Sequence, residues 1–186
     1  MRKPVRLRPA EVTDADVLYA YRLDEEVMYW GNGARGDIDP TREQMVERLR
    51  NQKSATDRTF AIEVEEEAGH WRMIGTVSYS GLDAFERVAT IGMMIGERAY
   101  WGGGYGTEAL EQFLYVLFRR LNLRRVELDT HEANKRAIRC YEKAGFVIEG
   151  VRRKRRYTIN GYQDQILMGL LREEWEERVQ LAPKYQ

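Results

Sequence analysis

The chain is poor in the residues that build disulfides and zinc sites. Cys140 is the single cysteine among 186 residues, so no disulfide can form within the chain. The two histidines, His70 and His131, have no recognisable zinc-ligand spacing. We interpret Cys140 as ordinary helix packing, because the local sequence places no histidine or carboxylate beside it to activate the thiol.

The chain also lacks net charge and long apolar runs. Its 30 Lys and Arg residues balance 30 Asp and Glu residues, which argues against a general nucleic-acid or membrane-surface binder. No apolar stretch approaches the ~20 residues that span a bilayer, and residues 1–4 lack the apolar core of a secretion signal. We therefore expect a cytoplasmic protein with no membrane or nucleic-acid partner. Its length and its 43% hydrophobic content predict one domain over residues 1–186.

Strand and helix patterns alternate along the chain without a linker or an internal repeat. Apolar alternation and short apolar runs predict strands at about residues 5–9, 60–64, 71–80, 88–95, 125–129, 146–151 and 164–171. Helices are expected from Thr13, from a capping box formed by Thr41 and Gln44, after the glycine-rich residues 102–106, and from Asn134 to Ala144 before Gly145.

The helix after the glycine-rich residues has apolar positions three and four apart, so one face can pack on a sheet. These positions are Leu110, Phe113, Leu114, Leu117, Phe118 and Leu121. The order strand, glycine loop, helix, strand implies a right-handed parallel crossover, whereas the flanking hairpins imply antiparallel pairing. The predicted class is α/β (α+β), with a central, mixed and mostly antiparallel sheet flanked by helices.

The most informative segment is residues 100–109, YWGGGYGTEA, at the junction of a strand and that helix. Its glycines allow tight turns and close approach to a ligand, and the unpaired N–H groups of a helix start favour an anion. A P-loop is excluded, because Gly106 is followed by Thr107 and Glu108 rather than by Lys and then Ser or Thr. A Rossmann fingerprint fits poorly, because its third glycine is missing. An anion cradle and a plain strand-to-helix turn stay open as alternatives.

Residues 91–109 and residues 131–146, HEANKRAIRCYEKAGF, together resemble two sequence blocks of the GNAT acyltransferase superfamily. The chain is most similar to the branch that contains ribosomal-protein N-terminal acetyltransferases of the RimJ and RimL kind and bacterial spermidine N-acetyltransferases. The resemblance runs from Arg6 to Gly161, nearly the whole chain. It implies a GNAT-like sheet with a splayed parallel strand pair, acetyl-CoA as co-substrate and, as relatives often pair, a homodimer.

The resemblance also implies roles for individual residues. Backbone groups of Met94, Ile95 and Gly96 would bind the pantetheine arm of acetyl-CoA, the Asn134 side chain would contact it, and Tyr141 would protonate the departing thiolate. Trp101 stands where many relatives have Gln or Arg, which affects one side-chain contact but not the backbone cradle. The loop that would wrap the pyrophosphate comprises Gly102, Gly103, Gly104, Tyr105, Gly106 and Thr107.

The chemistry of acetyl transfer explains this combination. The reaction needs a neutral amine, a donor to the developing oxyanion and a proton for the leaving sulfur. Tyr141 follows Asn134 by nearly two helical turns, so both side chains share one helix face. The alternative role for Tyr141 is that of a core tyrosine whose hydroxyl reaches solvent. No general base is placed by the sequence. The candidates, each also suited to a solvated or capping role, are Glu25, Glu26, Glu86, Glu97 and His131.

The acceptor is expected to be a primary amine of a small molecule or a protein N-terminus. Acidic residues favour a cationic amine such as a polyamine; they are Asp24, Glu25, Glu26, Asp37 and Asp39. The basic run Arg152 to Arg156, expected between the last two strands, would repel a polyamine and could instead bind an acidic partner or RNA, or simply face water.

We predict an acetyl-CoA-dependent N-acetyltransferase that works by direct transfer. Three alternatives stay open: an enzyme with a covalent Cys140 intermediate, a non-catalytic acyl-CoA-binding module, and a nucleic-acid-binding protein that uses the basic run.

Overall fold

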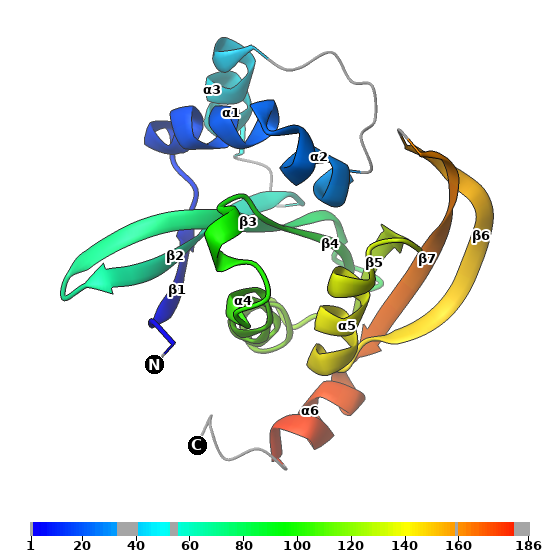
Figure 1. Cartoon of the computed structure of the whole chain (residues 1–186). Helices are drawn as coiled ribbons and strands as arrows, with labels where there is room; N and C mark the ends of the chain where they lie inside the picture. Colours follow the sequence, from blue (N-terminus) through cyan, green and yellow to red (C-terminus); the bar gives the residue numbers. More distant parts are fainter. Residues whose placement is uncertain (1, 33–40, 53–55, 159, 181–186) are drawn as a thin grey trace.

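The computed structural model describes residues 2–32, 41–52, 56–158 and 160–180. Within these residues, seven strands form one sheet in the order β1-β2-β3-β4-β5-β7-β6 (Figure 1). The strands are β1 (Val5–Pro9), β2 (Arg58–Glu67), β3 (His70–Asp83), β4 (Val88–Ile95), β5 (Arg125–His131), β6 (Val147–Thr158) and β7 (Gly161–Leu171). Among the described strands, β4 and β5 alone run parallel, and every other neighbouring pair is antiparallel. The mixed, mostly antiparallel sheet predicted from the sequence is confirmed.

Helices cover both faces of this sheet. Figure 1 shows α1, α2 and α3 on one side of the β2–β4 region and α4 on the other, with α5 beside α4. Their bounds are α1 (Ala15–Leu23), α2 (Glu25–Asn32), α3 (Arg42–Arg50), α4 (Tyr105–Tyr115), α5 (Lys135–Ala144) and α6 (Arg172–Gln180). Shorter turns are η1 (Val12–Asp14), η2 (Arg98–Tyr100) and the π-helical η3 (Val116–Arg120). None of the helices described here combines the length and the apolarity that crossing a membrane would require.

Two helix-end predictions are confirmed by their hydrogen bonds. Thr41 Oγ1 accepts from the Gln44 N–H at 3.2 Å, and Gln44 Oε1 accepts from the Thr41 N–H at 2.7 Å. This reciprocal capping box starts α3. Gly145 ends α5 with φ 103, a left-handed conformation that strains any residue with a Cβ.

The first helix does not start at Thr13 as predicted. A capping box of Glu11 and Asp14 starts η1, with the Glu11 N–H donating to Asp14 Oδ2 at 2.7 Å, and α1 follows from Ala15. Thr13 lies inside the turn, because Glu11 is the N-cap of η1 and Asp14 is the N3 residue of its capping box. The short helices α2 and α6 were not predicted at all.

Two further expectations need correction. Leu121 is 37% exposed instead of continuing the buried stripe of α4, because the i to i+5 hydrogen bonding of η3 rotates the chain relative to a regular helix.

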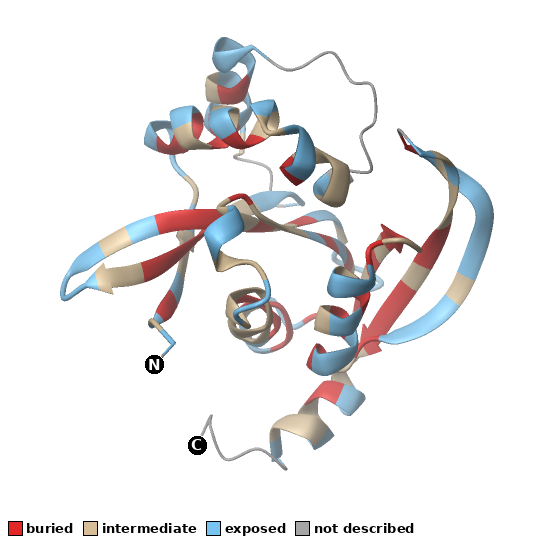
Figure 2. Cartoon of the chain, viewed as in Figure 1, coloured by how far each residue is buried: buried red, intermediate tan, exposed pale blue. Residues whose placement is uncertain are grey.

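The basic run Arg152 to Arg156 lies inside strand β6 rather than between strands. Figure 2 shows the outer strand β6 exposed along most of its length. The strand bulges at this run, because Arg152 pairs with Gln165 and Arg156 with Gln163, so that β6 has a longer segment than β7 between the two pairs.

The apolar residues form two clusters, one on each face of the sheet. The larger cluster centres on α4 and η3, where Leu110, Phe113, Leu114, Leu117 and Phe118 are all 0% exposed. The smaller cluster joins α1 and α3 to the other face; its members include Leu18, Tyr21, Met45, Leu49 and Ala61. The sheet is thus held from both sides, and the helices next to the end of β4 have fixed positions.

A buried ionic network ties the start of α1 to the sheet edge. Arg8 of β1 donates from Nη2 to Asp14 Oδ1 at 2.6 Å and from Nε to Glu63 Oε1 at 2.9 Å. Burial alone would raise the pKa of Asp14, but the hydrogen bonds from Arg8 and from the Glu11 N–H, with the Arg8 charge, hold that pKa below its ordinary value. Asp14 therefore stabilises the fold in its ionised form.

We predict that Asp14→Asn lowers the free energy of unfolding at neutral pH by about 1–3 kcal/mol, because charge-assisted hydrogen bonds are lost. The contribution of a carboxylate with a depressed pKa is complete above the unfolded value of about 3.9 and is lost as the pH falls through the folded pKa. Urea titrations at several pH values should show the variant and the parent converging below about pH 4. Asp16→Asn, at the solvent-exposed pair with Arg42, is the control and should change stability little. An equal loss in both variants would contradict the special role of Asp14.

Candidate functional site

The site begins where two neighbouring strands separate. Strands β4 and β5 are paired only from Val88–Arg125 to Thr90–Glu127. Beyond that register, β4 continues to Ile95 beside β3, while β5 continues to His131 beside β7. The sheet therefore opens between the ends of β4 and β5.

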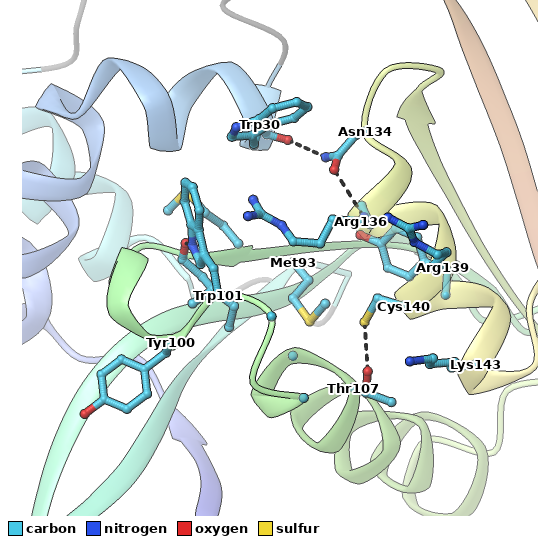
Figure 3. Close-up of a pocket in the computed structure, with 18 of the residues that line it drawn as sticks. Trp30, Met93, Tyr100, Trp101, Thr107, Asn134, Arg136, Arg139, Cys140 and Lys143 are labelled. Carbon is cyan, nitrogen blue, oxygen red and sulfur yellow. Dashed lines mark hydrogen bonds between the residues drawn. The ribbon is translucent and has the colours of Figure 1, made fainter. Parts of the chain in front are cut away.

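A pocket of about 430 Å³ lies at this opening, between the end of β4, the start of α4 and one face of α5 (Figure 3). Its size is in the range of small-molecule sites. Most of the residues singled out by the sequence line it: Met94, Ile95, Trp101, Gly102, Gly104, Gly106, Thr107, Asn134 and Tyr141. Gly96, Gly103 and Tyr105 are not part of the lining.

At the end of β4, the backbone N–H and C=O groups of successive residues point alternately toward β3 and toward the opening. The Gly96 N–H donates to Ile74 O at 2.8 Å, and the Met94 carbonyl lies against Gly75 of β3. Since neighbouring residues of a strand turn their polar groups to opposite sides, Ile95 turns its groups toward the opening. There the Trp101 indole donates from Nε1 to Ile95 O at 2.7 Å, which joins the loop to the strand end.

Gly96 itself is covered by α1. A Cβ built on Gly96 would lie 2.3 Å from the ring of Tyr21, whose hydroxyl donates to Met73 O at 3.0 Å. The N–H of Gly96 is thus engaged and its α-carbon is packed. Of the three backbone positions expected at the pantetheine arm, Ile95 is the one whose polar groups are directed to the gap.

The glycine loop leads into a helix start with unpaired donors. Gly104 has φ 82 and is the N-cap of α4. The Glu108 N–H donates to Gly104 O at 3.1 Å, so the N–H groups of Tyr105, Gly106 and Thr107 precede the first helical hydrogen bond. A Cβ on Gly106 would lie 3.4 Å from Met93 Cε and 3.8 Å from Cys140 Sγ, so this glycine allows β4, α4 and α5 to approach closely. The loop therefore has the geometry of an anion cradle.

Gly103 and Tyr105 support the loop from outside the pocket. A Cβ on Gly103 would lie 2.8 Å from the Tyr105 ring, which in turn packs edge-on against Tyr100 at 5.1 Å between centroids. Tyr105 Oη accepts from the Lys3 N–H at 3.5 Å. These contacts fix the loop rather than form the cavity surface.

Helix α5 supplies the opposite wall. Asn134 caps it, accepting from the Ala137 N–H at 3.1 Å, and donates from Nδ2 to Trp30 O at 2.9 Å, which ties α2 to α5 (Figure 3). Tyr141 is 6% exposed, packs edge-on against Phe146 and lines the pocket. Burial raises the pKa of Tyr141, so its hydroxyl keeps its proton at neutral pH.

The same face of α5 carries three cations that the sequence analysis did not single out. Arg136, Arg139 and Lys143 all line the pocket, and no described lining residue is acidic. The guanidinium of Arg136 lies 3.9 Å from the centroid of the Trp101 ring, toward which it extends in Figure 3. The spacing of three and four residues within a block already assigned to one helix was the signal that could have found them. Together with the start of α4, these cations suit a polyanionic ligand.

The environment of Cys140 is that of a packed thiol. Cys140 Sγ lies 3.4 Å from Thr107 Oγ1, a contact that joins α5 to α4 (Figure 3). Burial raises the pKa of the thiol above its ordinary value. A thiol that stays protonated at neutral pH is a poor nucleophile, which argues against a covalent mechanism.

The candidate bases are spread over different environments. Glu97 pairs with Arg72 at 3.1 Å and Glu26 with Arg98 at 2.6 Å, while Glu25 and Glu86 are exposed. His131 ends β5, is 4% exposed and is stacked on Trp30 at 5.9 Å. Burial lowers the pKa of the His131 imidazole below its ordinary value. None of these five residues lines the pocket.

Two of the acidic residues expected to attract a cationic acceptor, Asp24 and Glu26, have structural partners instead. Asp24 Oδ1 accepts from the N–H groups of Glu26 and Val27 at 3.0 and 3.1 Å and so caps α2. Its Oδ2 also pairs with Arg98 at 3.2 Å. Asp37 and Asp39 lie outside the described residues.

Comparison with known proteins agrees with this geometry. A model of the acetyltransferase (GNAT) domain matches residues 5–147. The uncharacterized N-acetyltransferase p20 of Bacillus licheniformis is 29% identical over 172 residues, 91% of this chain and 93% of that protein. An aminoglycoside N(6')-acetyltransferase type 1 of Klebsiella pneumoniae is 27% identical over 151 residues, 78% of this chain and 75% of that protein.

Among solved structures, the fold is similar to spermidine N-acetyltransferase from Vibrio cholerae in complex with CoA and spermine. The TM-score is 0.82 at 22% sequence identity, covering 92% of this chain and 98% of that one. At this identity the similarity concerns the fold.

We predict that iodoacetamide labels Cys140 slowly at pH 7–8 compared with free cysteine in the same tube. Because the pKa is raised, the thiolate fraction and with it the labelling rate should rise only at a pH above the ordinary thiol range of about 8.5. Intact-mass spectrometry measures the rate without ambiguity, since the chain has one cysteine. Labelling at neutral pH as fast as that of free cysteine would show an activated thiol and revive the covalent alternative.

Proposed function

The chain belongs to the GNAT acetyltransferase family and is an N-acetyltransferase that uses acetyl-CoA, and from this premise we propose how its pocket performs the transfer. The observation that carries the proposal is the joint lining of one cavity by the start of α4, by the end of β4 and by Tyr141. In this proposal acetyl-CoA occupies the opening between β4 and α5, and a primary amine reacts with it directly in a ternary complex.

The residues present fit the phosphate end of acetyl-CoA. The unpaired N–H groups of Tyr105, Gly106 and Thr107 would hold the pyrophosphate, helped by the positive end of α4. Arg136, Arg139 and Lys143 would add charge-assisted contacts to phosphate oxygens from the facing helix. Trp101 contributes by holding the loop to Ile95 and by stacking on Arg136.

The residues at the other end fit the thioester. Backbone groups of Ile95 in the gap would hold the pantetheine arm, and a strand N–H there would stabilise an oxyanion. Asn134 would contact the arm while it keeps α2 and α5 together. When bound, acetyl-CoA supplies an activated acyl carbon with a thiolate leaving group.

The bond changes balance with Tyr141 as proton donor. The lone pair of a neutral amine forms the N–C bond, the C–S bond breaks toward sulfur, and the Tyr141 hydroxyl gives its proton to the sulfur. The amine loses one proton to solvent, and Tyr141 regains one. The raised pKa of Tyr141 suits this role, because the hydroxyl is protonated before each turnover.

The proposed acceptor is a primary amine on a small molecule or a protein N-terminus. A polyamine is the second candidate, since the similar Vibrio cholerae structure is a spermidine N-acetyltransferase that holds CoA and spermine. The described lining of the pocket offers no carboxylate to the additional ammonium groups of a polyamine, which favours an acceptor with a single amine. A cytoplasmic location, a homodimer and a single domain over residues 1–186 stay predictions of the sequence.

Thiol release from acetyl-CoA against a panel of amines tests the function. The panel contains small amines, a peptide with a free N-terminus, an aminoglycoside and spermidine, and mass spectrometry locates the acetyl group on nitrogen. We expect at least one amine to accelerate thiol release far above hydrolysis. Binding of acetyl-CoA in calorimetry without acceleration by any amine would instead support a non-catalytic acyl-CoA-binding module.

We predict that Tyr141→Phe lowers kcat by about 10²-fold or more with little change in the affinity for acetyl-CoA, because only the proton donor is removed. Steady-state kinetics and calorimetry give the two values. Tyr115→Phe, at a 40% exposed position on α4, is the matched control and should leave kcat unchanged. An unchanged kcat in Tyr141→Phe would remove this residue from the acid role.

A further inference from the structure

A second cavity of about 190 Å³ lies against the face of β2, β3 and β4 that α1 and α3 cover. It shares Gly31, Met93 and Met94 with the first pocket. These shared residues belong to α2 and to the splayed end of β4. The two cavities therefore meet at the place where the proposed thioester would lie.

The floor of this second cavity is polar and open. Thr59, Ser78 and Gly92 lie opposite one another in the register of β2, β3 and β4, and Thr76 pairs with Met94. The hydroxyls of Thr59, Thr76 and Ser78 make no hydrogen bond with other described residues. Gly92 leaves the floor open, because a Cβ there would already lie 3.6 Å from Ser78 Oγ.

The rim of the cavity is cationic. Arg22 of α1 and Arg48 of α3 line it, beside an apolar wall of Leu18, Met45 and Leu49. Arg48 is exposed and forms no ion pair with the described part of the chain. No Asp or Glu of the described residues lines either cavity.

We propose that this second cavity is the acceptor site and that it takes a small primary amine that also bears an anionic group, a carboxylate or a phosphate. The inference rests on the proposed acetyl transfer. The guanidinium of Arg48, with Arg22 near it, binds the anion, and the hydroxyls of Thr59, Thr76 and Ser78 complete the contacts. The amine then points to Met93 and Met94, toward the shared opening.

Electrostatics supports this class of acceptor. The exposed guanidinium of Arg48 repels a polycation, so a polyamine gains nothing from this part of the rim. For an amine anchored by its anionic end, nearby positive charge disfavours the ammonium form and raises the share of the neutral nucleophile. The cavity is smaller than the 300–1,000 Å³ typical of drug-sized ligands, which favours a compact acceptor.

Matched pairs of acceptors test the proposal in the thiol-release assay. Each pair differs only in the anion: amino acids against their amides, and phosphoethanolamine against ethanolamine, with spermidine and a short peptide as further acceptors. We expect the anion-bearing member to have a KM lower by about tenfold or more, with the advantage shrinking as salt is added. The carboxylate and phosphate pairs show which anion is preferred.

Two variants connect the effect to the cavity. Arg48→Gln should raise the KM of the anion-bearing acceptor by about tenfold and leave the KM of its uncharged partner nearly unchanged. Arg50→Gln, an exposed position on the same helix outside both cavities, is the control. Gly92→Val fills the floor of the second cavity and should raise the KM of every acceptor that binds there. This variant tests the cavity while the residues of α3 stay unchanged.

Several outcomes would overturn the inference. The inference is refuted if the two members of each pair have equal KM values, if spermidine is preferred, or if the peptide alone accelerates thiol release. It is also refuted if Arg48→Gln has no larger effect than Arg50→Gln. Each of these results would leave acetyl transfer established. Absence of thiol release with every acceptor would refute the proposed function as well, so the two failures are distinguishable.

Discussion

The structure depends on the short parallel register between β4 and β5. Three residue pairs hold these strands together, after which each strand follows a different antiparallel partner. A parallel pair requires a crossover, and the crossover here is the glycine loop and α4, whose start is thereby brought beside the opening. The same divergence directs the polar groups of Ile95 toward the gap and lets α5 approach from the other strand. A longer register would close the pocket, and no register would leave α4 without a fixed position.

The balanced composition conceals an uneven distribution of charge. Acidic side chains near the site are engaged elsewhere: Asp24 and Glu26 with Arg98, and Glu97 with Arg72. The described lining of the first cavity therefore carries arginine and lysine, that of the second carries arginine, and neither contains a carboxylate. The proposed polyanionic co-substrate and the proposed anion-bearing acceptor rest on the same arrangement, since each described lining contains basic side chains and no acidic one.

Burial determines the protonation of the groups in the transferase site. Tyr141 and Cys140 are neighbours on α5, and burial raises the pKa of both, so both carry protons at neutral pH. A protonated phenol is a useful acid toward a thiolate, whereas a protonated thiol is a poor nucleophile. One physical cause thus favours direct transfer with Tyr141 as donor and disfavours a Cys140 intermediate.

The sequence by itself determined the fold class and all seven strands, but it did not predict the helices α2 and α6. Local patterns were sufficient for the capping box of Thr41 and Gln44, the end of α5 at Gly145 and the glycine start of α4, because these depend on hydrogen bonds and backbone angles within a few residues. Only the tertiary structure decided which groups meet. It covered Gly96 with Tyr21, placed the basic run inside β6, paired Asp24 and Glu26 with Arg98 and brought Arg48 to a cavity beside Met93. Those outcomes depend on contacts between segments far apart in the chain, which no local pattern encodes.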